Sequence, residues 1–579
     1  MSSQLRSVPV RRNGRLQACE PCRKRKLACD HGLPVCHRCQ KRKKPSECVY
    51  LAAPLTLSSA KNHTRPSLTG PPATEAPSTT NHQQCSTYRA VGGPKRPGKV
   101  LEQAPRSSHL FTTPNNYFGS TSFTAVFWEN QHNIERALPP GQTLQVTSEQ
   151  IQASSVAEVE AVLDFPSRTS RKILQRIPSQ ETCQILLARA FQGRDNWIDF
   201  GLQHCQDMLW STHGDSLNGT RNNEDLERLA RVLHKNATKP LLEPDDPVEW
   251  LDAFSGSNIR WEALGILFCG WMYGTLNPLS TDESLFPSST DSKRDKKQFQ
   301  LRLMNSVIDC VNLCSETDTV NPLIVHLLFR RALLHSIING DTSVLLWRTH
   351  GDFICALTAL GLHRESEVEQ AKVSLAKEYR RRLFSVAFQI DKSIASFTGR
   401  PPVLSYRYCT SRMPLDVSSH ALLSTEANLT KVASTLSADG WNTDGQIYAA
   451  TKLRMCMQLA RIRDEILEIS LGNQEALNVE RMKELRLRAE KTYLAFPAAI
   501  ILHPSESHKN DDEYWNKMSV RIRHLLNMFL IDQFLSKFGA TDGQVLLDTS
   551  REQLALILVL WTERDRFTSH WFDYEWIYC

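Results

Sequence analysis

Apolar residues recur every three or four positions over most of the chain from about residue 150 onward, which is the period of helices that bury one face. Breaks rich in Ser, Asp, Gly and Pro separate these stretches, and no sustained period-two alternation typical of strands is found. The pattern predicts a large all-α domain of about 400 residues including loops, which is long enough to bury a sizeable core.

The stretch 179–211 is long and amphipathic, with Ile185, Leu186, Ala188 and Phe191 expected on one face. This periodicity predicts one helix that packs against the rest of the domain through that face.

Residues 258–273 are apolar nearly all round, which predicts a buried helix. Asn321 and Pro322 are the residue types of an N-cap and a first helical position, and they precede an apolar helical run. Further helices are expected at 344–361, 378–397, 446–470, 477–494 and 514–537, with a looped insertion at 417–445.

The chain before this domain has a different composition. Residues 49–115 hold nine of the 28 prolines, and Ser, Thr, Asn and Gln fill the gaps, so no core can form and a disordered linker is predicted. Residues 1–18 are polar and basic, which predicts a mobile arm. No coiled-coil seam follows residue 48, because the leucines there do not repeat in heptads and prolines interrupt them.

Aromatic residues gather at two places outside the regular helices. Residues 117–128 are interpreted as a segment that packs on the helical domain, with a partner-binding motif as the alternative. Residues 571–579 alternate aromatic and acidic side chains, and we interpret them as an amphipathic helix packed on the domain rather than an activation segment.

Six cysteines lie within thirty residues of one another near the N-terminus: Cys19, Cys22, Cys29, Cys36, Cys39 and Cys48. They form two similar halves, each a Cys-x-x-Cys pair with a further cysteine downstream. The chain starts without the apolar segment of a secretion signal, and its longest strongly apolar run is far shorter than the roughly 18 residues of a membrane span. A reducing compartment is therefore expected, where metal is a better interpretation than disulfides.

Sulfur ligands favour zinc, which takes four of them in a tetrahedron. Two zinc ions need eight ligand positions, and six thiolates fill these only if two of them bridge. The near-symmetric spacing favours this arrangement. A single ion held by Cys19, Cys22, Cys36 and Cys39 is the alternative.

Positive charge is concentrated around these cysteines. Residues 1–50 contain 13 Lys and Arg against three Asp and Glu, whereas the whole chain contains 69 against 62, so the remainder is slightly acidic. A small, basic, metal-held unit is typical of phosphate binding, and a short helix can enter the major groove. A solvated charged face or a nuclear import signal is the plain alternative. The candidate DNA contacts are Arg23, Lys24, Arg25, Lys26, Arg38, Lys41, Arg42, Lys43 and Lys44.

The segment 19–48 resembles the fungal Zn2Cys6 binuclear-cluster DNA-binding domain at every cysteine. The resemblance implies that Cys19 and Cys36 bridge two zinc ions and that Pro34 is the loop proline. It also implies that Lys26, with Arg25 beside it, reads bases in CGG-containing duplex DNA. Because few apolar residues are available, folding of this segment is expected to depend on metal.

A second resemblance lies in the helical region. Gly361–Arg364, Arg380–Phe384, Asp391 and Gly399–Pro402 are similar to signatures of the fungal-specific transcription factor regulatory domain, over about 150–420. Gly399 is expected to end a helix. Arg380–Arg382 are expected on a helix surface, pairing with Asp391 or Glu378. In that family a further helix usually follows a run such as 571–579, so a shortened product is one interpretation of the C-terminus.

No catalytic constellation is recognised. Cys269 and Cys355 are expected in the core, Cys310 and Cys314 share a helix face without a histidine, and His350 and His363 are expected to be structural. Phosphate-binding glycine loops and hydrolase or metalloprotease motifs are not found. We therefore predict that the chain is not an enzyme.

These observations predict four segments: a basic arm at 1–18, a Zn2Cys6 domain at 19–48, a linker at 49–115 and an all-α regulatory domain at 116–579. The expected function is a nuclear, zinc-dependent transcription regulator, more often an activator in the resembled family, of RNA polymerase II genes in a metabolic or secondary-metabolite pathway. Expected partners are double-stranded DNA, the transcription machinery, a second copy through the helical domain and a small-molecule effector, with no membrane. Binding to DNA as a monomer is the alternative to pairing with a second copy. A zinc-dependent RNA-binding or protein-interaction module on a helical scaffold is the alternative.

Overall fold

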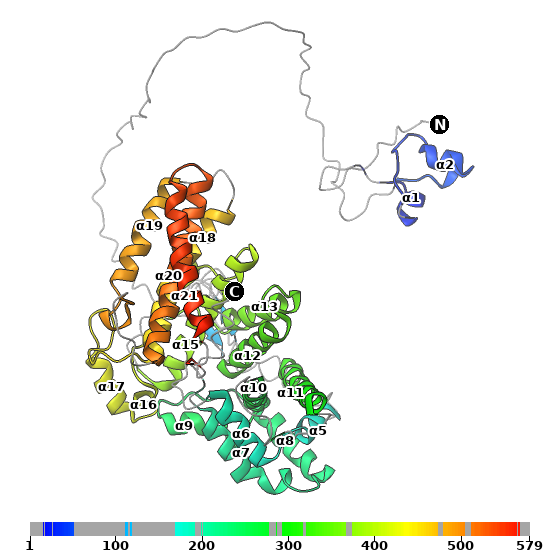
Figure 1. The fold of residues 1–579 in the computed structure, drawn as a ribbon. Coiled ribbons are helices and arrows are strands. Elements are labelled where there is room, and N and C mark those ends of the chain that lie inside the picture. The colour runs from blue at the N-terminus through cyan, green and yellow to red at the C-terminus, as the bar shows by residue number, and fades with distance from the viewer. Residues whose placement is uncertain are drawn as a thin grey trace, which may run out of the picture. The chain divides into compact units, whose positions relative to one another are not determined.

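The computed structural model describes residues 16, 18–25, 27–50, 111–113, 116–118, 168–191, 199, 201–276, 285, 292–316, 320–365, 373–472, 479–503, 511–563 and 566–567. The chain divides into two compact units, residues 1–101 and residues 102–579 (Figure 1). The described residues 18–50 of the first are called the cysteine module, and the second is called the helical unit.

The cysteine module contains two five-residue helices, α1 (Glu20–Lys24) and α2 (His37–Lys41), and a 3-10 turn, η1 (Pro45–Glu47). Each helix begins directly after a cysteine whose backbone is extended at the N-cap position. Helices this short are not stable alone in water. Five of the six cysteine side chains are buried and form the interior, so this module is held together around sulfur rather than around a hydrocarbon core.

The helical unit begins with a short antiparallel hairpin, β1 (Phe111–Thr113) and β2 (Asn116–Phe118), in which Phe111 pairs with Phe118. The helices that follow are α5 (Arg168–Gln175), α6 (Gln180–Phe191), α7 (Leu202–Leu217), α8 (Asn223–Thr238), α9 (Pro247–Asp252), η2 (Gly256–Asn258), α10 (Trp261–Leu276), α11 (Ser292–Ser315), α12 (Pro322–Asn339), α13 (Val344–Ala359), α15 (Leu375–Thr398), η4 (Tyr406–Tyr408), α16 (Ser419–Leu422), α17 (Glu426–Ser434), α18 (Ala449–Leu471), α19 (Val479–Leu494), η6 (Ala498–Ile500), α20 (Asp511–Lys537) and α21 (Gly543–Thr562). The predicted all-α class is confirmed.

Among the described residues, the helices of this unit are arranged around one large core and four smaller ones. In the large core, α6, α11 and α12 pack against α10. Three of the smaller cores lie among α18, α19, α20 and α21, which form an extended bundle at one end of the unit (Figure 1). The fourth lies among α12, α13 and α15. The contact between α15 and α18 joins the two parts.

Three local predictions are confirmed. The buried helix expected at 258–273 is α10, in which nearly every side chain is buried. The Asn321 side chain caps α12 by accepting hydrogen bonds from the N–H groups of Leu323 and Ile324, at 2.9 and 3.1 Å. Gly399 ends α15 in the left-handed conformation with φ of 65°, where a side chain would be strained.

The prediction of one helix over 179–211 is wrong. The structure has two helices there, α6 ending at Phe191 and α7 beginning at Leu202. The sequence between them carries Gly193 and Gly201 with Asp and Asn nearby, which favour turns. The face of α6 is also rotated, because Ala188 is exposed while Cys183, Leu186, Leu187 and Ala190 are the buried residues.

Several other expectations change. Cys355 is exposed rather than part of the core, because α13 turns that position outward. The insertion 417–445 contains α16 and α17, and α21 was not predicted as a helix. The hairpin lies across the boundary expected between the linker and the regulatory domain. The arm 1–15, most of the linker and the segment 571–579 lie outside the described residues.

Two glycines of α10 allow α6 to approach closely. A Cβ atom at Gly274 would lie 2.1 Å from the Leu186 carbonyl oxygen, and one at Gly270 would lie 3.0 Å from Leu187 Cδ1. Because a backbone atom cannot move aside cheaply, we expect Gly274→Ala to lower the free energy of unfolding by about 3 kcal/mol. Gly351→Ala is the matched control in α13, where a Cβ would meet nothing within 4 Å.

The control substitution should be neutral or stabilising by up to about 1 kcal/mol, since alanine is the better helix former. Urea unfolding of both variants followed by circular dichroism measures the difference. Equal midpoints for the two variants would mean that the α6–α10 contact is not as close as the structure has it.

Candidate metal centre and nucleic-acid interface

The sulfur atoms of the cysteine module converge on one another. Cys19 Sγ lies 3.6 Å from Cys36 Sγ, 3.8 Å from Cys39 Sγ and 3.8 Å from Cys29 Sγ. Cys22 Sγ lies 3.9 Å from Cys36 Sγ. Cys19 therefore has sulfur neighbours from both halves of the module.

These separations fit a zinc-thiolate cluster. Two thiolates bound to one tetrahedral zinc at about 2.3 Å stand about 3.8 Å apart, whereas disulfide sulfurs are about 2.05 Å apart. The sulfurs of Cys19, Cys22, Cys36 and Cys39 all lie within 4.8 Å of one another. Cys29 contacts this group through Cys19, and Cys48 Sγ accepts a hydrogen bond from the Cys36 N–H at 3.3 Å. The side chains of all six cysteines are therefore gathered in one cluster.

The thiols of this group differ in acidity. Burial raises the pKa of Cys39 to about 12 and that of Cys19 further still. Burial acts in the same direction on Cys36, but hydrogen bonds from the Cys39 N–H and from neighbouring thiols outweigh it and bring its pKa to about 7. Zinc binding requires these protons to leave, so metal affinity of this module should rise with pH.

Short polar contacts position the cysteines from both sides. Asp30 accepts a hydrogen bond from the N–H of His37 at 3.1 Å, which fixes the start of α2. The Tyr50 hydroxyl donates to the Gly32 carbonyl at 3.2 Å and lies 3.7 Å from Cys29 Sγ. Glu20 N–H donates to the Val49 carbonyl at 2.9 Å, so the end of the module returns to its beginning.

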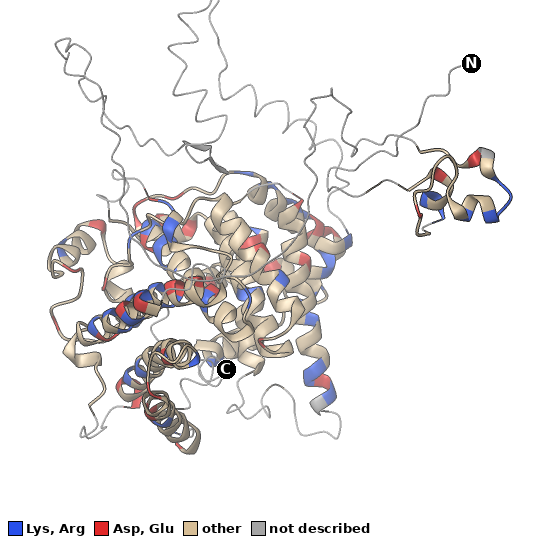
Figure 2. Ribbon diagram, turned by 90° about the horizontal axis from the view of Figure 1, so that it is seen from above, with Lys and Arg blue, Asp and Glu red and all other residues tan. Residues whose placement is uncertain are grey.

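Eight of the nine predicted DNA contacts lie in described parts of the module, and all eight are exposed. Lys and Arg lie along both short helices of the module (Figure 2). Arg23 and Lys24 lie on α1 with Arg25 directly after it, and Arg38 and Lys41 lie on α2, followed by Arg42, Lys43 and Lys44. Lys26, the predicted base-reading residue, lies outside the described residues. The basic surface predicted from composition is therefore present on both helices.

Acidic neighbours engage part of this surface, which the sequence analysis did not foresee. Arg23 makes two hydrogen bonds of 2.7 Å to Glu20, and Lys24 Nζ lies 3.6 Å from the same carboxylate. Lys44 contacts Glu47 at 2.7 Å. Lys44 and, to a smaller extent, Arg25 lower the pKa of Glu47.

In the helical unit the signature residues named from the sequence are mostly structural. Arg381 and Arg382 are buried, so their expected place on a helix surface is wrong. Arg381 pairs with Glu378 at 2.7 Å, as predicted, and also with Glu365. Asp391 does not pair with these arginines, because its side chain points toward α13 and the chain after α15.

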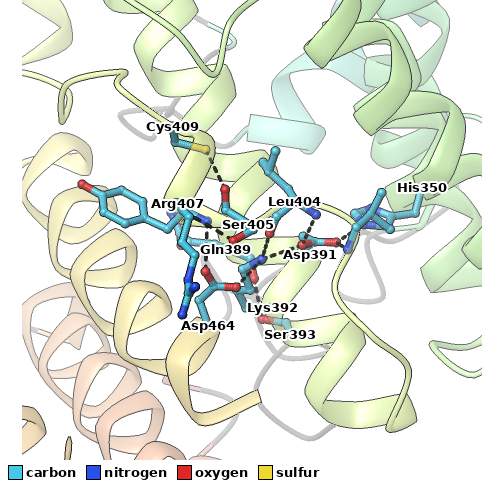
Figure 3. Close-up of polar contacts among 12 residues, drawn as sticks. His350, Gln389, Asp391, Lys392, Ser393, Leu404, Ser405, Arg407, Cys409 and Asp464 are labelled. Carbon is cyan, nitrogen blue, oxygen red and sulfur yellow. Dashed lines mark hydrogen bonds and ion pairs between the residues drawn. The ribbon is translucent and has the colours of Figure 1, made fainter. Parts of the chain in front are cut away.

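Asp391 belongs to a buried network that the sequence analysis missed. Lys392, fully buried, lies between Asp391 at 2.8 Å and Asp464 of α18 at 2.9 Å, and it also contacts the Leu404 carbonyl (Figure 3). His350 of α13 contacts the other side of Asp391 at 3.0 Å. The sequence did offer a signal for this network, because the charged residues Asp391 and Lys392 lie side by side within the apolar helical stretch 378–397.

One cavity of the helical unit has a volume of about 280 Å³. It is lined by Glu243, Asp245, Leu362, Arg364, Glu365, Ser374, Ala376, Lys377, Arg380, Arg381 and Ser411. Charges of both signs face it, and Arg380 makes two hydrogen bonds to Glu243 at 2.8 and 2.9 Å. Arg381 and Glu365, which also line the cavity, form a second ion pair, so several of its charged side chains already have partners.

Comparison with known proteins gives two family matches. The model described as the fungal Zn(2)-Cys(6) binuclear cluster domain matches residues 17–56. The model described as the fungal specific transcription factor domain matches residues 228–485. The first domain binds two zinc ions, and the sulfur separations above fit that assignment.

One curated relative is "Transcription factor FBD3" of Gibberella moniliformis, which is 32% identical over 161 residues. The match covers 28% of this chain and 21% of the relative, so the chain spans only a small part of that protein's length. No solved structure matches. Among the described helices, none combines the length and the apolar character needed to cross a membrane.

Proposed function

Since this chain belongs to the fungal transcription factors that join a Zn(2)-Cys(6) binuclear cluster domain to a fungal specific transcription factor domain, we propose that it is a zinc-dependent activator that reads CGG-containing duplex DNA. The observation that carries the proposal is the convergence of six sulfurs beneath a basic surface. A metal-held basic module of this kind binds the phosphate backbone and places short helices near base edges.

In this proposal Cys19 and Cys36 bridge the two zinc ions. Cys19 supports this role through its contacts to Cys29 of one half and Cys39 of the other. Cys36 contacts Cys22 of the first half, and its N–H donates to Cys48 of the second. The remaining four cysteines would supply two further ligands to each zinc ion, and the two ions would provide the cross-links that fold the module.

The nine basic residues have two roles in the proposal. Lys26 and Arg25, which follow α1, read guanine edges in the major groove. Arg23, Lys24, Arg38, Lys41, Arg42, Lys43 and Lys44 bind phosphates and set the register. In this arrangement the residues directly after α1 read the bases, and the basic residues of α1, of α2 and of the turn after α2 bind the phosphate backbone.

The helical unit completes the proposed regulator. We place the protein in the nucleus, where it would recruit the transcription machinery to RNA polymerase II genes of a metabolic or secondary-metabolite pathway. Pairing with a second copy would occur through this unit, and a small-molecule effector would bind between its helices. That the chain has no enzymatic activity stays a prediction.

Selection of binding sites from a random duplex library tests this function with the zinc-loaded full chain. We expect enrichment of CGG, and we expect Lys26→Ala to erase that enrichment because a guanine contact is worth about 1–3 kcal/mol of discrimination. Lys43→Ala is the matched control, since losing a phosphate contact should weaken binding to all sequences alike. Binding without enrichment, or preference for RNA, would favour the RNA-binding or protein-interaction alternative.

A further inference from the structure

The two halves of the cysteine module differ in how their cations are neutralised. In the first half, Arg23 and Lys24 both contact Glu20. In the second half, Lys44 contacts Glu47 at 2.7 Å, whereas Arg38, Lys41, Arg42 and Lys43 make no ion pair among the described residues of the module. The number of basic residues does not reveal this difference, because the first half carries four and the second half carries five.

Glu20 is held in place to act on both of its cations. It is the first residue of α1, and its N–H is bonded to the Val49 carbonyl at 2.9 Å. Its carboxylate receives Arg23 Nε and a terminal guanidinium nitrogen in a two-point contact of 2.7 Å each, the stronger geometry for such pairs. The Glu20 side chain is 20% exposed, whereas those of Arg23 and Lys24 are 50% and 71% exposed.

A cation that is already paired contributes less to non-specific DNA binding. Each phosphate neutralised by Lys or Arg releases condensed counterions and adds about 0.9 to the slope of log affinity against log salt. To bind a phosphate, Arg23 must first leave Glu20, whose charge then faces the DNA uncompensated. The free cations of the second half carry no such cost.

We propose that Glu20 is a specificity-determining residue, a role that rests on the DNA-binding function proposed above. It restrains Arg23 and Lys24 so that the first half of the module binds firmly only where base contacts repay the rearrangement. Non-specific attraction to phosphate is left to α2 and the turn after it. The expected consequence is a high ratio of specific to random-sequence affinity for a module with so many cations.

The test measures affinity of the zinc-loaded full chain for a selected site and for random duplex at several salt concentrations. For Glu20→Gln we expect the slope of log affinity against log salt on random duplex to steepen by about 1–2. Affinity for random duplex should rise roughly threefold for each basic side chain, Arg23 or Lys24, that is freed from the carboxylate. Affinity for the selected site should rise less, so the specificity ratio falls. An unchanged slope, or an equal rise on both DNAs, would overturn the proposal.

Two controls separate this role from a general charge effect and from misfolding. Glu20→Gln made in a chain that already carries Arg23→Gln and Lys24→Gln should have no effect on the slope, whereas a general charge effect would persist. In the native background, Lys41→Gln should reduce the slope by about 0.9 and Lys24→Gln by clearly less. Zinc content and thermal midpoint measured on the same samples report folding.

The outcomes also distinguish this proposal from the function on which it depends. If the native chain binds no duplex DNA at any salt concentration, the proposed function fails. If the native chain binds and selects DNA but Glu20→Gln behaves like it, only the role of Glu20 fails.

Discussion

Replacing Cys19 with serine is expected to abolish sequence-specific DNA binding and to unfold the cysteine module. Cys19 has sulfur neighbours from both halves, so its loss removes a ligand from both proposed zinc sites. Structural zinc contributes about 10–16 kcal/mol in small zinc domains, far more than this module can recover from its few apolar residues. Zinc content by elemental analysis and DNA binding by mobility shift measure the two effects.

Cys355→Ser is the matched control, because that cysteine is exposed on α13 and lies outside the module. It should keep two zinc ions and native DNA affinity. Strong chelation of the native chain should reproduce the Cys19→Ser result without altering the helical unit. A Cys19→Ser chain that retained two zinc ions and native affinity would contradict the bridging role.

Replacing Asp391 with alanine is expected to destabilise the helical unit by about 3–5 kcal/mol, the range found when one member of a buried ion pair is removed. Asp391 accepts hydrogen bonds from His350, Lys392 and the N–H groups of Val403 and Leu404, at 2.8–3.0 Å. Without it, Lys392 keeps Asp464, but the other donors lose their acceptor (Figure 3).

Urea unfolding of the full chain followed by circular dichroism measures this effect, since the described helices lie almost entirely in the helical unit. Asp352→Ala is the matched control, because this residue is 58% exposed and lies 3.9 Å from Arg331. We expect it to change stability by less than about 0.5 kcal/mol. Equal changes in the free energy of unfolding for the two variants would argue that the buried network around Lys392 does not stabilise the helical unit.

The same carboxylate predicts a component of acid unfolding. Burial acts to raise the pKa of Asp391, but His350 and Lys392 outweigh it and hold that pKa below its usual range. Its contribution is therefore present above about pH 4 and is lost as the pH falls through the folded pKa. Asp391→Ala should remove this component from an acid titration followed by circular dichroism.

A second component should begin at higher pH and remain in that variant. Burial lowers the pKa of His326 to about 3, so the folded state binds its proton less well than the unfolded state does. Stability should fall as the pH drops below about 6.5, where the unfolded histidine becomes charged. An acid titration that started only near pH 4 would contradict a neutral, buried His326.

Local sequence patterns determined much of this protein. The spacing of six cysteines was sufficient to predict a zinc cluster, because metal ligation depends on residue type and short separations. The all-round apolar stretch predicted the buried helix α10, and Asn321, Pro322 and Gly399 predicted helix ends, because caps act within a few residues. The concentration of basic residues at 1–50 predicted the charged module.

Only the tertiary structure decided which of these groups meet. Ala188 and Cys355 lie on apolar patterns yet are exposed, because burial depends on which neighbouring helix arrives at that face. Lys392 meets Asp464 from a helix more than seventy residues away, a contact that no local pattern contains. The engagement of Arg23 and Lys24 by Glu20 follows from the turn of α1, so a count of charges alone overstates how many are free for DNA.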